Sequence, residues 1–131
     1  MKRIISTDKA PAAVGPYSQA VLSNGLLFVS GQIPVNPADG TVASTIEEQS
    51  HQALKNVGAI LEAAGLGYGD VVKTTVLLSD IADFKAMNAV YAEYFTQDKP
   101  ARACFQVAAL PLGVKVEIEV VADATKTCQD E

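Results

Sequence analysis

Polar and apolar residues alternate in several short segments of the chain, which is the pattern of β-strands that bury one face. Residues 114–122 show it most clearly, because three valines and an isoleucine fall on one side and a lysine and two glutamates on the other. Residues 101–109 alternate as well, with Arg102, Cys104 and Gln106 on one face. Both segments are therefore predicted to be strands.

A β-hairpin and a further strand are predicted from turn residues and β-branched residues. Asn24 and Gly25 stand between the apolar residues 20–22 and 26–29. Both residues tolerate positive φ, and an Asn-Gly pair in this setting is typical of a tight hairpin. Residues 71–78 (VVKTTVLL) are rich in β-branched side chains, which favour a strand.

Two helices are expected from apolar residues at helical spacing. The first is predicted over residues 45–64, with Ser44 and Glu47 as a capping box at its start and Gly65 at its C-terminal cap. Asp80 is expected to cap the second. One face of this second helix carries Phe84, Met87, Asn88, Tyr91 and Tyr94.

The order of these elements is strands, helix, strand, helix and two strands. It predicts an α+β fold in which a mixed β-sheet is covered on one face by two helices. The other face carries threonine, lysine, arginine, cysteine and glutamate among apolar residues, too apolar for solvent and too charged for a core. A subunit interface that encloses polar pockets would satisfy both observations. We expect one domain, residues 1–131, with residues 125–131 frayed.

Composition narrows the classes of function. The net charge is −5 and no run of Lys or Arg occurs, which argues against a nucleic-acid surface. No apolar stretch is long enough to span a membrane, and no export signal is recognised. Cys104 and Cys128 do not look like a disulfide pair, which favours a reducing cytoplasm. With one histidine, His51, and two distant cysteines, the spacing of metal ligands is missing.

Two charged residues are the main candidates for chemistry. Arg102 is either a solvated arginine at the start of a strand or a clamp for an anion, because its planar guanidinium matches a carboxylate with two hydrogen bonds. Glu117 is either part of an exposed sheet face or a general base, for which partial burial would raise the pKa towards working pH.

Other polar residues have two interpretations each. Cys104 is more typical of a small buried residue than of a nucleophile, since no histidine is near it in sequence. Asn88 lies on the apolar face of its helix, so it either braces the fold or faces a ligand. Tyr17 is a surface ring or the cap of a pocket. Ser30 and Gly31 form a strand end, or a place where the backbone approaches a ligand. His51 is expected to be a solvated helix residue.

Several segments, in order along nearly the whole chain, resemble the motifs of one family. They are residues 10–20 (APAAVGPYSQA), 30–34 (SGQIP), 73–76 (KTTV), Asn88, 99–104 (KPARAC), 110–111 (LP) and 116–119 (VEIE). The family they resemble is the RidA (YjgF) family. Such an ordered set is specific for the family, and less so for the substrate.

The resemblance implies a chorismate-mutase-like fold and a homotrimer with three clefts between subunits. It implies hydrolysis of reactive 2-imino acids, 2-iminopropanoate and 2-iminobutanoate, to 2-oxo acids and ammonia, without metal or organic cofactor. By similarity, Arg102 binds the substrate carboxylate, Glu117 activates water, and Cys104 lines the site. The positions around the pocket are matched by Tyr17, Ser30, Gly31 and Asn88.

Some questions stay open at this point. Ala103 and Ala109 stand where serine and arginine are frequent in the family, so the charge at the rim and the substrate preference are undecided. The expected partners are small 2-imino and 2-oxo acids, with no nucleic acid and no membrane, in the cytoplasm. The alternatives are a trimer that senses 2-oxo acids without turnover, a ribonuclease or translation inhibitor, and a chaperone-like trimer. Glu117 favours the enzyme, because a sensor would need only Arg102.

Overall fold

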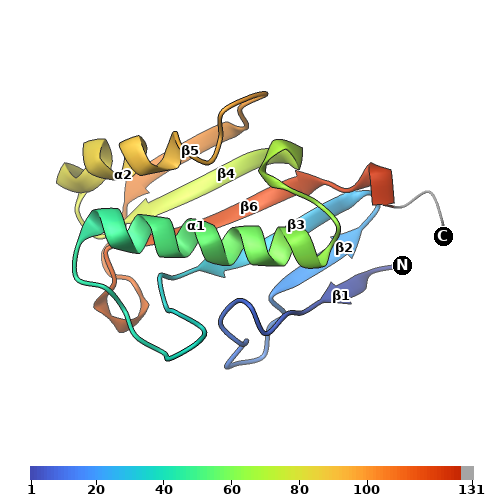
Figure 1. Ribbon diagram of the computed structural model, residues 1–131, viewed down its shortest axis with the longest axis horizontal. Helices are drawn as coiled ribbons and strands as arrows, with labels where there is room; N and C mark the ends of the chain where they lie inside the picture. The colour runs from blue at the N-terminus through green and yellow to red at the C-terminus, as the bar shows by residue number, and fades with distance from the viewer. Residues whose placement is uncertain (128–131) are drawn as a thin grey trace.

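The computed structural model describes residues 1–127, which form a six-stranded mixed sheet with helices on one side (Figure 1). The strands are β1 (Arg3–Ile5), β2 (Ala20–Ser23), β3 (Leu26–Gln32), β4 (Val71–Leu78), β5 (Ala101–Gln106) and β6 (Val116–Asp123). Their order across the sheet is β1-β2-β3-β6-β4-β5. All neighbouring strands are antiparallel except β4 and β5, which are parallel. The predicted α+β class with a mixed sheet is confirmed.

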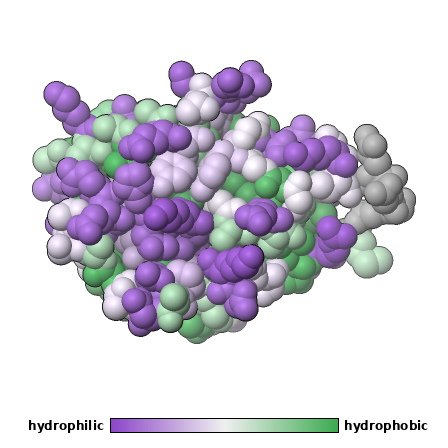
Figure 2. Space-filling view, in the orientation of Figure 1, coloured by the Kyte–Doolittle hydropathy of each residue, from purple (hydrophilic) through white to green (hydrophobic). Residues whose placement is uncertain are grey.

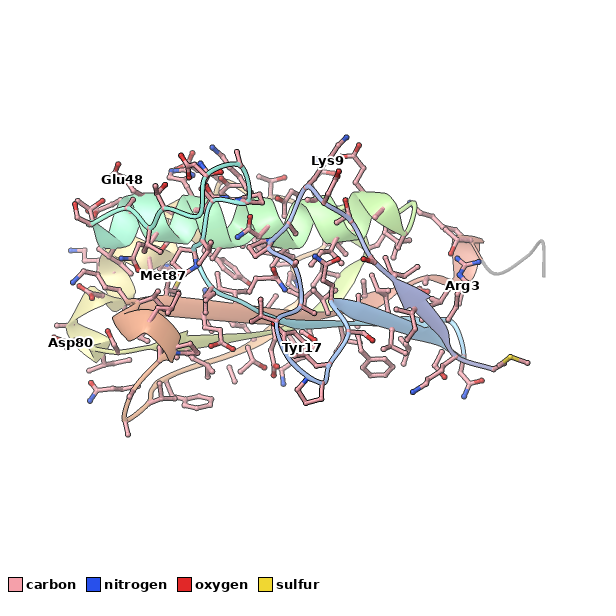
Figure 3. The ribbon with its side chains drawn as sticks, turned by 90° about the horizontal axis from the view of Figure 1, so that it is seen from below. Arg3, Lys9, Tyr17, Glu48, Asp80 and Met87 are labelled. Atoms are coloured by element: carbon pink, nitrogen blue, oxygen red, sulfur yellow. The ribbon has the colours of Figure 1, made fainter. Side chains whose placement is uncertain are left out.

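Two α-helices, α1 (Ile46–Ala63) and α2 (Phe84–Tyr91), cover the same face of the sheet (Figures 1 and 3). The core lies between them and the sheet, where Leu54 and Ile60 of α1 and Ile118 of β6 are fully buried. The outward side of the helix layer is largely hydrophilic (Figure 2). Short 3-10 helices occupy Tyr68–Asp70, Ile81–Asp83, Pro111–Gly113 and Thr125–Thr127.

The ends of α1 are set by side-chain and backbone capping. The N-cap is one residue later than predicted: Thr45, not Ser44, accepts a hydrogen bond from the backbone N–H of Glu48. The prediction at the other end is confirmed, since Gly65 adopts φ +77° and its N–H donates to Glu62. This arrangement is the Schellman motif, which satisfies carbonyls that would otherwise lack partners.

The predicted hairpin is also confirmed. Asn24 and Gly25 have φ of +52° and +75°, and the strands on either side pair in antiparallel register. By contrast, β1 was not predicted from the sequence, because three residues show too little alternation. Its residues pair with β2 at the edge of the sheet, with Ile4 opposite Val21.

Other boundaries differ from the sequence prediction. Asp80 caps the 3-10 helix before α2 rather than α2 itself, and α2 ends at Tyr91, so that Tyr94 lies beyond the helix. The predicted strands 101–109 and 114–122 are observed as β5 and β6 with shifted ends. Residues 125–127 form a 3-10 turn rather than a frayed end. Cys128 and the remainder of the expected frayed tail lie outside the described residues.

The sheet face opposite the helices is partly apolar. Phe28 of β3 and Phe105 of β5 are each 47% exposed, and Glu119 of β6 is exposed on the same strand face as Glu117. This mixture agrees with the sequence description of that face, with one correction. Arg102 and Cys104 lie on the side of the sheet that the helices cover, because β5 pairs with β4 in the register Thr74 to Arg102, and Thr74 is buried beneath α2.

Candidate functional site

Arg102 is held by α2 and by an aromatic pair. Its Nη1 donates a hydrogen bond of 2.7 Å to Oδ1 of Asn88. The guanidinium carbon lies 4.7 Å from the ring centre of Tyr91 and 5.5 Å from that of Phe84. Within residues 1–127, no carboxylate forms an ion pair with Arg102. Among these residues the exposed guanidinium therefore has only neutral partners, and its positive charge is available to an anion.

Cys104 lies two residues further along β5, on the same face as Arg102. Its side chain is half-buried and packs against the core. Burial raises the pKa of the thiol, and the charge of Arg102 lowers it in part. A thiol with a raised pKa is mostly protonated at neutral pH, which makes it a poor nucleophile.

Glu117 lies on the opposite face of the sheet, next to Gly31. A Cβ on Gly31 would collide with Oε2 of Glu117 and would lie 2.9 Å from its Cδ. The pairing of β3 with β6 shifts register between Val29 and Gln32, so Gly31 lies within a bulge. Burial of the carboxyl group, followed by repulsion from Glu119, raises the pKa of Glu117. This is the direction expected for a general base.

Tyr17 and Ser30 belong to the Gly31 side of the molecule. The Ser30 hydroxyl donates a hydrogen bond of 2.6 Å to the carbonyl of Ser18 and so holds the loop that carries Tyr17. This loop runs from Lys9, beside α1, to Tyr17 on the sheet side (Figure 3). Tyr17 and Gly31 line a cavity of about 210 Å³ together with Ile33 and other mostly apolar residues.

The structure thus divides the candidate residues into two groups. Arg102, Asn88 and Cys104 lie together near α2, whereas Glu117, Gly31 and Tyr17 lie around the other face. The register across the sheet explains why: Arg102 pairs with Thr74 and Glu117 with Leu77 of the same strand. Because Thr74 and Leu77 are three residues apart, their side chains point to opposite faces. One chain therefore does not bring Arg102 and Glu117 to the same ligand.

Sequence reasoning missed several residues of the Arg102 environment. Phe84 and Tyr91 were recognised only as the apolar face of a helix, although their rings flank the guanidinium. The available signal was the spacing of Phe84, Asn88 and Tyr91, which places all three on one helix face. His51 is not the solvated residue that was expected: it is half-buried, and its Nδ1 lies 2.7 Å from the hydroxyl of Tyr94.

Among residues 1–127, no three His, Cys, Asp or Glu side chains are grouped so that they would hold a metal ion. No α-helix in that range is both long and apolar enough to cross a membrane.

The sequence of this chain is similar to those of a known protein family. Residues 7–124 match the family model described as Endoribonuclease L-PSP. The chain belongs to this family. The family description refers to RNA cleavage, whereas several relatives of this L-PSP family protein carry deaminase names.

One relative is the human protein named 2-iminobutanoate/2-iminopropanoate deaminase, which is 54% identical over 123 residues, covering 93% of this chain and 90% of the human protein. Another is the chloroplastic Reactive Intermediate Deaminase A of Arabidopsis thaliana, which is 53% identical over 122 residues. That match covers 92% of this chain and 65% of the longer plant protein. The RidA resemblance found in the sequence is thereby confirmed.

Solved structures of the L-PSP family have the same fold. The crystal structure of E. coli TdcF with bound serine matches with a TM-score of 0.88 and 45% identity, covering 92% of this chain and 98% of TdcF.

Proposed function

We propose that this chain is a 2-iminobutanoate/2-iminopropanoate deaminase, which hydrolyses short 2-imino acids to 2-oxo acids and ammonia. The observation that carries the proposal is the guanidinium of Arg102, which is held by Asn88 and two rings and has no carboxylate partner among the described residues. Such a group suits the carboxylate of a small substrate. The names of the human and plant relatives and the serine bound to TdcF support it.

The chemistry needs a positioned substrate and an activated water. Arg102 binds the carboxylate, and Cys104 lines the same face of the site. Glu117 accepts a proton from water as the water oxygen attacks C2 of the protonated imine, which gives a carbinolamine. Glu117 then gives this proton to the nitrogen and, as the C2–N bond breaks and ammonia leaves, accepts the proton of the C2 hydroxyl, so that the C2–oxygen bond becomes the carbonyl of the 2-oxo acid. Transfer of that proton to the ammonia gives ammonium and restores the carboxylate. Positioning and base catalysis suffice for this reaction, because a protonated imine is already electrophilic.

The site forms between copies of the chain. Arg102 and Glu117 lie on opposite faces of the sheet, so a ligand that meets both must receive one of them from a neighbouring copy. The open face carries Phe28 and Phe105, each 47% exposed, which an interface would bury. An interface that joins two different surfaces forms a ring when the rotation between copies closes, and closure after three copies gives a homotrimer with three equivalent clefts.

Deamination is tested by generating 2-iminobutanoate in situ with an amino-acid oxidase and trapping it with semicarbazide. The protein is expected to lower the amount of trapped imine. Unchanged trapping, in protein of native fold, would refute the activity.

The intersubunit site is tested with two variants that are each inactive. An Arg102→Ala chain keeps Glu117, and a Glu117→Gln chain keeps Arg102. In trimers assembled from an equal mixture of both, about a quarter of the sites receive both native residues. Refolding the mixture is therefore expected to restore about a quarter of wild-type turnover, whereas each variant refolded alone stays inactive. A mixture that stays inactive would mean that the site does not lie between copies.

A further inference from the structure

The hydroxyl of Thr74 is buried at a position where the chain has no evident need for a polar group. Thr74 is in the middle of β4, is 0% exposed, and faces α2. Valine has a similar shape, is a good strand residue and would bury no hydroxyl. A buried hydroxyl costs free energy unless it is hydrogen-bonded. The partner of Thr74 is the hydroxyl of Tyr91, at 2.8 Å.

This hydrogen bond fixes a ring that also contacts Arg102. The Tyr91 ring lies 4.5 Å from that of Phe95, centre to centre, and the guanidinium carbon of Arg102 lies 4.7 Å from its centre. The hydroxyl end of the ring is held by Thr74. Tyr91 is therefore fixed both by packing and by a hydrogen bond, and it offers a defined surface to the guanidinium.

Arg102 needs such a surface because its side chain is long and exposed. An arginine side chain loses substantial rotamer entropy when it is held in one conformation. The hydrogen bond to Asn88 fixes the position of Nη1. By itself, this bond would still let the guanidinium plane rotate about Nη1. An aromatic ring stacked against the guanidinium restricts the rotation of its plane. Asn88 and Tyr91 together leave the remaining N–H groups in a defined direction.

We infer that Thr74 and Tyr91 are positioning residues for Arg102, with the Thr74–Tyr91 hydrogen bond orienting the ring on which the guanidinium rests. The register of the sheet supports this, because Thr74 is the β4 residue directly beside Arg102 on β5. The expected consequence is tighter binding of a carboxylate ligand, and this consequence rests on the proposed function. It also gives a role to the KTTV segment, residues 73–76, to which the proposed reaction assigns none.

The test removes the hydrogen bond and keeps the shape. Thr74→Val and Tyr91→Phe each lose it, whereas Thr74→Ser keeps a hydroxyl and is expected to behave like the wild type. Tyr68→Phe is the matched control, since the Tyr68 hydroxyl donates a 2.7 Å hydrogen bond to the carbonyl of Leu54 and Tyr68 is not among the rings that contact Arg102. Thermal unfolding of all four variants reports whether each folds.

Two measurements are made on every variant. Nitrogen-15 NMR of the Arg102 side chain reports rotation of the guanidinium and needs no ligand. It is expected to show restricted rotation in the wild type, Thr74→Ser and Tyr68→Phe, and faster rotation in Thr74→Val and Tyr91→Phe. The Kd of 2-oxobutanoate is expected to rise about 2- to 12-fold in the latter two, the range for the loss of one hydrogen bond. KM should rise with Kd, while kcat falls by less, since the carboxylate is not the reacting group.

The outcomes separate this inference from the proposed function. Unchanged guanidinium rotation in Thr74→Val and Tyr91→Phe would overturn the positioning role. An equal rise of Kd in Tyr68→Phe would overturn it as well, because general loosening would then explain the effect. A double variant that weakens binding by the product of the two single effects would contradict a shared hydrogen bond. A wild type that restrains Arg102 but does not deaminate would refute the proposed function alone.

Discussion

The carboxylate of Glu117 occupies the space that a side chain on Gly31 would need. Gly31 does not have a positive φ, so its backbone alone would accept alanine. What requires glycine at this position is the neighbouring carboxylate. Close approach is one of the general reasons for a glycine within a strand, and a bulge, in which Gly31 also lies, is another.

Gly31→Ala is therefore expected to displace Glu117 and to lower turnover by about 100-fold, the cost of moving a catalytic group by about 1 Å. The matched control is Gly69→Ala, since a Cβ there meets no atom within 4 Å. Turnover and thermal unfolding are measured on both variants. Normal turnover in Gly31→Ala would show that Glu117 needs no exact placement.

Glu117→Gln keeps the shape of the side chain and removes the proposed base. Turnover should fall by about 10²- to 10⁴-fold, the usual contribution of a general base. Binding of 2-oxobutanoate, measured by calorimetry, should persist through Arg102. If binding and turnover fell together, Glu117 would be a structural residue and not the base.

The pH dependence of kcat/KM is expected to depend on Glu119, the neighbour of Glu117 on β6. A base acts only when deprotonated, so kcat/KM falls as the pH falls through the pKa of Glu117. Repulsion from Glu119 contributes to raising that pKa. Glu119→Gln removes this repulsion, lowers the pKa of Glu117, and should move the acid limb of the profile to lower pH. The control is Glu62→Gln, an exposed glutamate on α1, which should leave the limb in place. A limb that moves to higher pH with Glu119→Gln would contradict the assignment.

Arg102→Ala should abolish deamination while the fold is kept. In the proposed cleft the bound substrate desolvates its charge pair with Arg102, and removing one partner of such a pair costs about 2–5 kcal/mol, a loss of about 30- to several-thousand-fold. Arg102→Lys should restore only part of the activity, because an ammonium group does not form the bidentate pair. Steady-state kinetics of both variants decide this, and wild-type activity in Arg102→Ala would refute the carboxylate clamp.

Cys104→Ser should keep substantial turnover, because water is the attacking species in the proposed reaction and burial raises the pKa of the Cys104 thiol. Alkylation with iodoacetamide, in a Cys128→Ser background, should block turnover through the bulk of the adduct. Complete loss of activity in a correctly folded Cys104→Ser protein would instead require a covalent intermediate.

The parts of the fold that depend on neighbouring residues were predictable from the sequence. The Asn24-Gly25 hairpin, the span of α1 and the alternation of β6 are set by local turn chemistry and periodicity. The N-cap was misplaced by one residue because Ser44 and Thr45 are both suitable caps, followed at the same spacing by Glu47 and Glu48. The position of β6 between β3 and β4 is a long-range pairing, which periodicity does not encode.

The candidate site was predictable as a set of residues, but not as a geometry. Alternation showed that Arg102 and Cys104 share a face of their strand, yet it does not tell which face the helices cover. The separation of Arg102 from Glu117 follows only from the register of β4 with both neighbouring strands. The aromatic support of Arg102 was missed because Phe84 and Tyr91 also fit an ordinary core-facing helix. The single-domain organisation, the cytoplasmic location and the absence of a cofactor stay predictions.

The position of β6 has a consequence for how the protein is made. Among the described strands, β6 comes latest in the chain, yet it fills the middle of the sheet between β3 and β4. During synthesis the nascent chain therefore carries two strands whose inner edges have no partner until residues 116–123 leave the ribosome. Unpaired edges recruit strands from other chains. A chain that ends before Val116 therefore keeps two unpaired strand edges. Chaperones are needed most while residues 116–123 are still being made.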